Sequence, residues 1–149
     1  MCLSKYCPMC LEVYNMGLFP FRKKKQTPEE RAEMLYTEGM TLITNGYWDS
    51  AFNSISKAAQ LGHRGAMGQL AMMYIFGQGC EPDRSKGIDL LRKSVELGNL
   101  FSCYAFSVLW DHNVEGITAE EAKLMCEAAA NAGMPEAIER LNKGFDTKE

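Results

Sequence analysis

The 149-residue sequence lacks the patterns that most often signal catalysis or membrane insertion. No apolar run approaches the roughly 20 residues that a membrane-spanning helix needs. No nucleophile elbow occurs, and Gly77-Gln78-Gly79 has neither the following lysine nor the preceding strand of a phosphate-binding loop. The neighbours Asp111 and His112 point about 100° apart on a helix, so they do not form an acid–base relay. We therefore expect a protein that is not an enzyme, with no catalytic residues and no cofactor.

A complete metal-binding motif is also missing. Cys7 and Cys10 have Cys-x-x-Cys spacing and Cys2 lies nearby, but no second Cys-x-x-Cys or His-x-x-x-His follows. A tetrahedral zinc site needs four ligands. Zinc bound by Cys2, Cys7 and Cys10 is therefore a minor alternative whose fourth ligand would be Cys80, His63 or His112. A thioredoxin-like redox pair needs a βαβ context that this sequence does not have.

The remaining cysteines and the first residues of the chain indicate the cellular compartment in which we expect the protein. Cys80, Cys103 and Cys126 do not follow the repeat period described below, so we expect them to be small buried hydrophobic residues. The first residues lack the charged-then-apolar order and the small-residue cleavage site of a secretory signal peptide. We predict a cytoplasmic protein whose thiols stay reduced.

Positive charge is scarce overall and concentrated near the N-terminus. The formal net charge of −3 excludes a strongly basic nucleic-acid binder, so no nucleic-acid partner is expected. Residues 1–26 carry a net charge of +4, which leaves −7 for the rest of the chain. Residues 1–21 are rich in apolar, sulfur-containing and aromatic side chains. A basic cluster closes this segment: Arg22, Lys23, Lys24 and Lys25.

Glycine recurs in one local context at a near-constant interval. Gly62, Gly98 and Gly133 each follow Leu or Ala, and they are separated by 36 and 35 residues. This interval is typical of stacked helix pairs and not of a single globular core. We therefore divide the chain into an N-terminal arm, residues 1–26, and a helical repeat domain, residues 27–149.

Capping patterns place helices between these glycines. Thr27, Pro28 and Glu30 form a capping box with proline at the first helical position, and Thr118 with Glu121 repeats the box. The predicted fold class is all-α, an α-solenoid of about three antiparallel helix pairs plus a C-terminal capping helix. The predicted helices cover residues 28–44, 49–61, 64–76, 84–97, 100–112, 119–132 and 135–142.

The middle of the chain resembles the Sel1-like repeat, a branch of the tetratricopeptide-like helical superfamily. The first pair resembles an ordinary tetratricopeptide unit, and the third departs from the pattern because Ser102, Phe106 and Trp110 replace Ala66, Leu70 and Tyr74. The residues that carry the resemblance are Ala58, Ala59, Gln60, Leu61, Gly62, Ala66, Leu70, Ala71, Tyr74, Gly77, Gln78, Gly79, Asp83, Lys86, Gly87, Leu91 and Gly98.

The resemblance implies a function as well as a fold. Members of this family are adaptors and scaffolds that bind partners on a concave surface lined by the first helix of each pair. The alternative is that many of the corresponding apolar side chains belong to the core. Aligning Gly39, Ala71 and Ser107 as equivalents implies a partner-binding set: Glu33, Tyr36, Met40, Ile43, Met72, Ile75, Phe76, Phe101, Tyr104, Val108, Asp111 and His112, with Thr44 and Gly68 beside them.

Two functions remain open from the sequence. One is a non-enzymatic adaptor that binds a segment of another protein, and the other is a dedicated inhibitor or immunity protein whose acidic surface covers one basic target. The oligomeric state is open too.

The arm also has more than one interpretation. Its apolar part would either cap the first repeat or pack into the protein's own groove. Its basic cluster, Arg22 to Lys25, would be a solvated linker or would contact a membrane surface or an acidic partner.

Overall fold

The computed structural model describes residues 26–144, and these residues form seven α-helices and no strand. The helices are joined by short turns, and each is between 8 and 17 residues long. Their bounds are α2 (Pro28–Thr44), α3 (Trp48–Gln60), α4 (Arg64–Phe76), α5 (Arg84–Glu96), α6 (Leu100–Asp111), α7 (Ala119–Asn131) and α8 (Pro135–Asn142).

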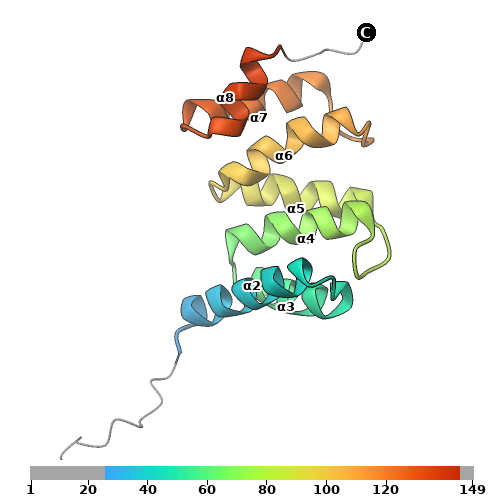
Figure 1. The fold of residues 1–149 in the computed structure, drawn as a ribbon, viewed down its shortest axis with the longest axis vertical. Coiled ribbons are helices and arrows are strands. Elements are labelled where there is room, and N and C mark those ends of the chain that lie inside the picture. Colours follow the sequence, from blue (N-terminus) through green and yellow to red (C-terminus); the bar gives the residue numbers. More distant parts are fainter. Residues whose placement is uncertain (1–25, 145–149) are drawn as a thin grey trace, which may run out of the picture.

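The helices stack one pair after another along a single direction (Figure 1). Helix α2 packs on α3, α4 on α5 and α6 on α7, while α8 packs on α7 at the far end. The pairs join through α3 with α4 and through α5 with α6, and the second of these junctions is the less closely packed. The predicted solenoid of three helix pairs and a capping helix is therefore confirmed.

Local capping explains where the helices begin and end. The Thr27 hydroxyl accepts a hydrogen bond from the Glu30 amide while the Glu30 carboxylate accepts one from the Thr27 amide, which completes the expected capping box. After α3, α5 and α7 the chain turns at Gly62, Gly98 and Gly133, whose φ angles are +87°, +77° and +88°. Glycine adopts this left-handed conformation without the steric cost of a Cβ atom. The predicted bounds are correct for α2, α4 and α8, and the other four helices end one residue earlier than predicted.

Small buried side chains allow the helices to approach closely. Ala51, Ala58, Ala66 and Ala71 are fully buried. The larger core residues fill the remaining space in three clusters that follow one another along the stack, with Ile55 in the first, Phe106, Leu91 and Leu109 in the second, and Cys103 and Cys126 in the third.

The three cysteines in the described range are free thiols. Cys103 and Cys126 are buried as predicted, whereas Cys80 is only partly buried. Cys103 lies on α6 and Cys126 on α7, so one helix pair contains two cysteines that share a buried cluster.

The loops inside the second and third pairs use the same kind of backbone despite their different sequences. Gly77 and Gly79 have φ angles of +67° and +70° in the second pair, and Asn113 and Gly116 have φ angles of +52° and +91° in the third. Asparagine tolerates the left-handed region better than most residues. The departure of the third loop from Gly-x-Gly is thus a change of sequence that keeps two left-handed positions. Across residues 26–144, no helix is both long and apolar enough to cross a membrane.

Candidate functional site

The first helices of the three pairs, α2, α4 and α6, carry the residues predicted to contact a partner. We call the accessible side chains among these predicted residues, together with their neighbours His63, Gln69 and Arg140, the A face. Eleven of the twelve predicted residues are exposed or partly buried: Glu33, Tyr36, Met40, Ile43, Met72, Phe76, Phe101, Tyr104, Val108, Asp111 and His112.

The exception is Ile75, and this correction concerns the central helix α4. Ile75 is 4% exposed and belongs to the hydrophobic core, so it does not belong to the accessible surface. Gly68 is also buried, because Ser102 and Asn99 approach it so closely that a Cβ atom would lie 2.5 Å from the Ser102 hydroxyl. Helix α4 is covered by neighbouring pairs on both sides. Its accessible stripe is therefore narrow: Gly65, Gln69, Met72 and Phe76.

At the junction of α2 with α4, three side chains of the A face are locked together through His63. The Nδ1 atom of His63 accepts a hydrogen bond from the Ala66 amide at 3.0 Å, and this bond caps α4. In the neutral ring Nε2 therefore carries the proton and donates it to the Glu33 carboxylate at 2.9 Å. The ring also stacks on Tyr36 with 4.4 Å between centroids. Burial raises the pKa of Tyr36, and the nearby Glu33 carboxylate raises that pKa further.

At the opposite ends of α4 and α6, a second pair of rings connects neighbouring repeats. The Phe76 ring meets the His112 ring edge to face, with 6.2 Å between centroids. Phe76 is 46% exposed, and so is Phe101 at the start of α6. The A face therefore presents a large, partly exposed aromatic side chain at the end of α4 and another at the start of α6.

Helix α8 reaches the same side of the stack through Arg140. The Arg140 guanidinium forms an ion pair with Asp111 and donates a hydrogen bond to the Ser107 carbonyl at 2.9 Å. Asp111 is thus engaged in holding the capping helix on α6. It belongs to the predicted set, but its carboxylate serves an internal contact.

Sequence reasoning missed His63, Gln69 and Arg140 on this face. His63 stood directly before a predicted helix, which is the position of an N-cap, but histidine is not among the usual N-cap residues. Gln69 is polar and lies between apolar neighbours, and its accessibility follows only from the packing around α4. Arg140 meets a residue 29 positions earlier in the chain, and no local pattern reports such a contact.

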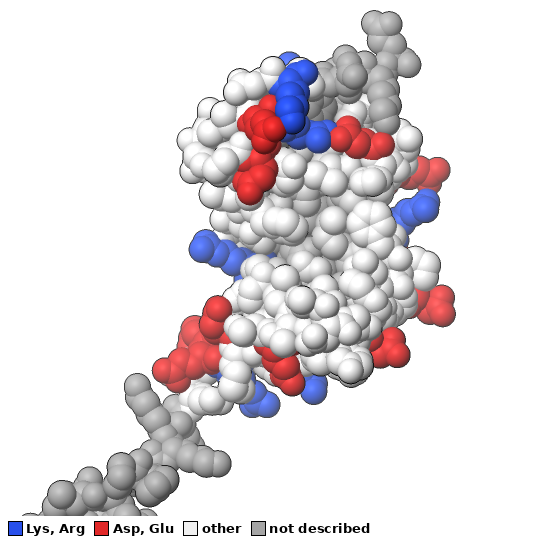
Figure 2. All heavy atoms as spheres, viewed as in Figure 1, with Lys and Arg blue, Asp and Glu red and all other residues white. Residues whose placement is uncertain are grey.

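Charge is distributed unevenly around the stack. Figure 2 shows Asp and Glu side chains gathered near the two ends of the stack on the side in view, while the middle is mostly uncharged and hollowed. Three exposed carboxylates, Glu29, Glu30 and Glu33, lie in the first two turns of α2. These carboxylates therefore attract a basic segment to this end of the molecule and repel an acidic one.

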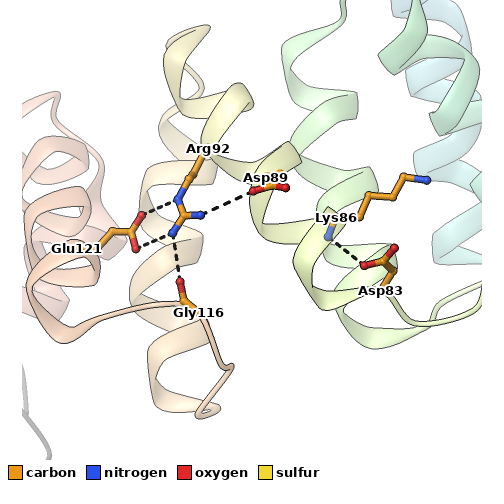
Figure 3. Close-up of polar contacts among 6 residues, drawn as sticks. All are labelled: Asp83, Lys86, Asp89, Arg92, Gly116 and Glu121. Atoms are coloured by element: carbon orange, nitrogen blue, oxygen red, sulfur yellow. Dashed lines mark hydrogen bonds and ion pairs between the residues drawn. The ribbon is translucent and has the colours of Figure 1, made fainter.

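The second helices are joined by an ion-pair network on another side of the stack (Figure 3). The Arg92 guanidinium on α5 binds both carboxylate oxygens of Glu121 on α7, at 3.0 and 3.1 Å, and donates to the Gly116 carbonyl at 3.1 Å. The hydrogen bond to Glu121 raises the pKa of Arg92. This arrangement ties the α6–α7 loop to α5.

A shallow pocket of about 430 Å³ lies along α5, but it is a weaker candidate site. Its lysines and aspartates alternate, so it favours neither sign of charge. Lys86 donates a hydrogen bond to the Tyr74 hydroxyl at 2.8 Å, and this bond raises the pKa of Lys86. The pocket is lined by Asp83, Ser85, Lys86, Asp89, Leu90 and Lys93.

The described residues offer no metal centre. No group of three or more His, Cys, Asp or Glu side chains is placed to hold an ion within residues 26–144. The proposed zinc ligands Cys2, Cys7 and Cys10 lie outside the described residues, as do Arg22, Lys23, Lys24 and Lys25. Among the suggested fourth ligands, His63 uses both ring nitrogens in the contacts above, and burial raises the pKa of the Cys80 thiol.

Comparisons with known proteins identify the fold. No protein-family model matches the chain, and no curated protein is significantly similar to it in sequence. A search of solved structures finds the crystal structure of a Sel1 repeat protein from Oxalobacter formigenes, with a TM-score of 0.60 and 22% sequence identity. The match covers 85% of this chain and 55% of that one, so the chain spans about half the length of the similar structure.

Proposed function

Because the chain folds as a Sel1-like repeat solenoid, we propose that it is a non-enzymatic protein–protein interaction module that binds a segment of another protein on the A face. Solenoids of stacked helix pairs expose an extended surface in place of an enclosed cavity. The observation that carries the proposal is the row of accessible apolar and aromatic side chains on successive first helices: Met40, Met72, Phe76, Phe101 and Val108.

The energetics favour this face for binding. Phe76 and Phe101 are each 46% exposed, so burying the exposed part of each ring contributes roughly half of the 1.5–3 kcal/mol that complete burial of a large apolar side chain gives. Methionine adapts its shape to different surfaces, and aromatic residues are over-represented among the residues that dominate binding energy. A partner segment with apolar side chains at helical or extended spacing fits such a surface.

An adaptor role suits the A face better than a dedicated inhibitor role does. The accessible A-face side chains of α4 and of the first two turns of α6 carry no charge, which favours apolar contact, whereas an inhibitor that acts through charge needs acidic residues in its interface. A cytoplasmic location remains part of the proposal. The free thiols of Cys80, Cys103 and Cys126 support it, because such thiols persist in a reducing compartment.

The test is affinity capture from the source cell, followed by measurement of the affinity of the captured protein for two variants. Phe101→Asp places a charge on the A face, and Leu124→Asp is the matched control on α7, where Leu124 is 60% exposed. We expect Phe101→Asp to weaken binding by at least about tenfold and Leu124→Asp to change it little.

Two results of this test would count against the proposal. Equal binding by both variants would remove the A face from the interface. A single dominant partner, lost at high salt and unaffected by Phe101→Asp, would favour the inhibitor.

A further inference from the structure

We propose that the apolar part of the N-terminal arm, residues 1–21, docks on the A face of its own chain and competes there with the partner. The inference rests on the proposed function, because it concerns regulation of the same surface. It commits to one occupant of the A face, a segment of this chain that precedes the described residues.

The composition of the segment matches the chemistry of the surface. Residues 1–21 contain leucine, methionine, phenylalanine, tyrosine and valine, with only Lys5 and Glu12 as charged residues. The A face is a surface of the same kind, and its largest accessible rings are Phe76 and Phe101.

The exposed surface of α2 and α3 is mostly polar, which argues against the alternative that residues 1–21 cap the first helix pair. Met34 is the one exposed large apolar side chain inside α2 or α3 beyond their first turns, and Tyr47 and Trp48 lie where the two helices join. The other exposed residues of these helices are mostly polar, among them Arg31, Glu38, Asn53 and Lys57. The outer end of the stack is therefore already suited to water.

Charge favours the intramolecular contact. Residues 1–26 carry a net charge of +4 and the rest of the chain carries −7. Only Gln26 and Thr27 separate Lys25 from α2, whose first two turns expose Glu29, Glu30 and Glu33. Figure 2 shows acidic side chains gathered at this end of the stack. The basic cluster that ends the arm is thus adjacent in sequence to the carboxylates of Glu29, Glu30 and Glu33, which lie at the start of the first A-face helix.

The segment is also long enough to cover the face. Directly packed helices lie about 8–10 Å apart. Because α2, α4 and α6 contact their own partner helices more than one another, the row of first helices is at least about 20 Å across. A 21-residue segment spans about 31 Å as a helix and about 70 Å when extended. Either conformation reaches from Thr27 across the three first helices.

The covalent connection makes even weak docking effective. Short flexible linkers give effective concentrations of about 1 mM, so a segment with a dissociation constant of ~0.1 mM is docked about 90% of the time. A partner that needs the free face then binds about tenfold more weakly than its intrinsic affinity.

The experiment is photo-crosslinking of the full-length chain with p-benzoylphenylalanine in place of Phe76 on the A face. A matched probe replaces Leu124, which is exposed on α7. Because the probe is itself a phenylalanine derivative, it disturbs α4 little, and circular dichroism checks the helix content of both proteins. Crosslinked monomer is digested, and the joined peptides are identified by mass spectrometry.

We expect the probe at position 76 to crosslink within one molecule to peptides from residues 1–21, at several times the yield of the probe at position 124. Leu11→Asp with Val13→Asp in the same chain lowers that yield. Equal yields at the two positions, crosslinks only between two molecules, or no crosslinks to residues 1–21 would each overturn the inference.

This readout needs no partner, so it fails or succeeds independently of the proposed function. Partner affinity is compared in chains that also carry Leu11→Asp and Val13→Asp, because Phe101→Asp would otherwise release the arm and offset a loss of partner contact. Crosslinks to the arm in the native chain, together with Phe101→Asp leaving partner affinity unchanged in this background, would keep the docking and remove the proposed binding surface. Partner binding that is sensitive to Phe101→Asp, without crosslinks to the arm, would do the reverse.

Discussion

At the scale of the residue, glycine sets how closely the loop of the second pair approaches the first pair. A Cβ atom on Gly79 would lie 2.2 Å from the Trp48 carbonyl oxygen, whereas one on Gly46 would meet no atom within 4 Å. Both glycines have left-handed backbones, with φ of +70° and +79°. Both positions therefore need a left-handed backbone, but only at Gly79 would an added side chain collide with a neighbouring helix.

We predict that Gly79→Ala destabilises the protein more than Gly46→Ala. The left-handed conformation costs about 1–2 kcal/mol for alanine at either site, and displacing the Trp48 backbone adds about 1–3 kcal/mol at Gly79. Urea denaturation followed by circular dichroism measures both free energies of unfolding. Equal losses would show that the loop moves away from Trp48 without cost.

Single residues also show how far the sequence predicts which side chains of the first helices are accessible. The equivalence of Gly39, Ala71 and Ser107 selected side chains of which most are exposed or partly buried, because the repeat period relates the same side of successive first helices. It failed at Ile75, because α4 has neighbours on both sides, whereas α2 begins the stack. A repeat pattern gives the orientation of a helix, but the width of its exposed stripe depends on what packs beside it.

At the scale of the element, the start of α4 depends on a histidine. His63 caps the helix through Nδ1, contacts Glu33 through Nε2 and stacks on Tyr36. These three contacts hold the first turn of α4 against α2. They make His63 a positioning residue for the A face at the junction between the first two helix pairs.

We predict that His63→Ala lowers the free energy of unfolding by about 1–2 kcal/mol, because it removes the N-cap and the ring stack. His63→Asn restores a side chain that caps helices well and recovers part of that loss. Glu33→Gln is the control, since a glutamine oxygen still accepts the Nε2 proton. Thermal unfolding of the three variants measures the difference, and equal losses for alanine and asparagine would contradict the capping role.

The helices themselves were predictable because their signals are local. Thr27 with Glu30, the Thr118 N-cap, and the glycines after α3, α5 and α7 all act within a few residues of the boundary that they set. The predicted second capping box is only half formed, because the Thr118 hydroxyl accepts from the Glu121 amide while the Glu121 carboxylate binds Arg92. The connections between helices were not predictable in this way. Arg92 meets Glu121 and Arg140 meets Asp111 across 29 residues each, and only the folded stack brings these side chains together.

At the scale of the whole molecule, the chain divides its surface into sides with different properties. The first helices α2, α4 and α6 carry the accessible apolar and aromatic residues of the A face. The second helices α5 and α7 carry the Arg92 ion-pair network that joins them (Figure 3). The second helices thus help to hold the repeats in line, and the first helices present the surface that we propose to bind a partner.

The most direct test of the A face as a binding surface is hydroxyl-radical footprinting of the full-length protein carrying Leu11→Asp and Val13→Asp, which keep the arm off this face, with and without the captured partner. Methionine and aromatic side chains react readily with the radical, and the A face offers Met72, Phe76, Phe101 and Tyr104. The account predicts that the partner lowers oxidation at these four residues by several fold and leaves the exposed Leu97 and Leu124 unchanged. Protection at Leu97 and Leu124, with no change on the A face, would contradict it.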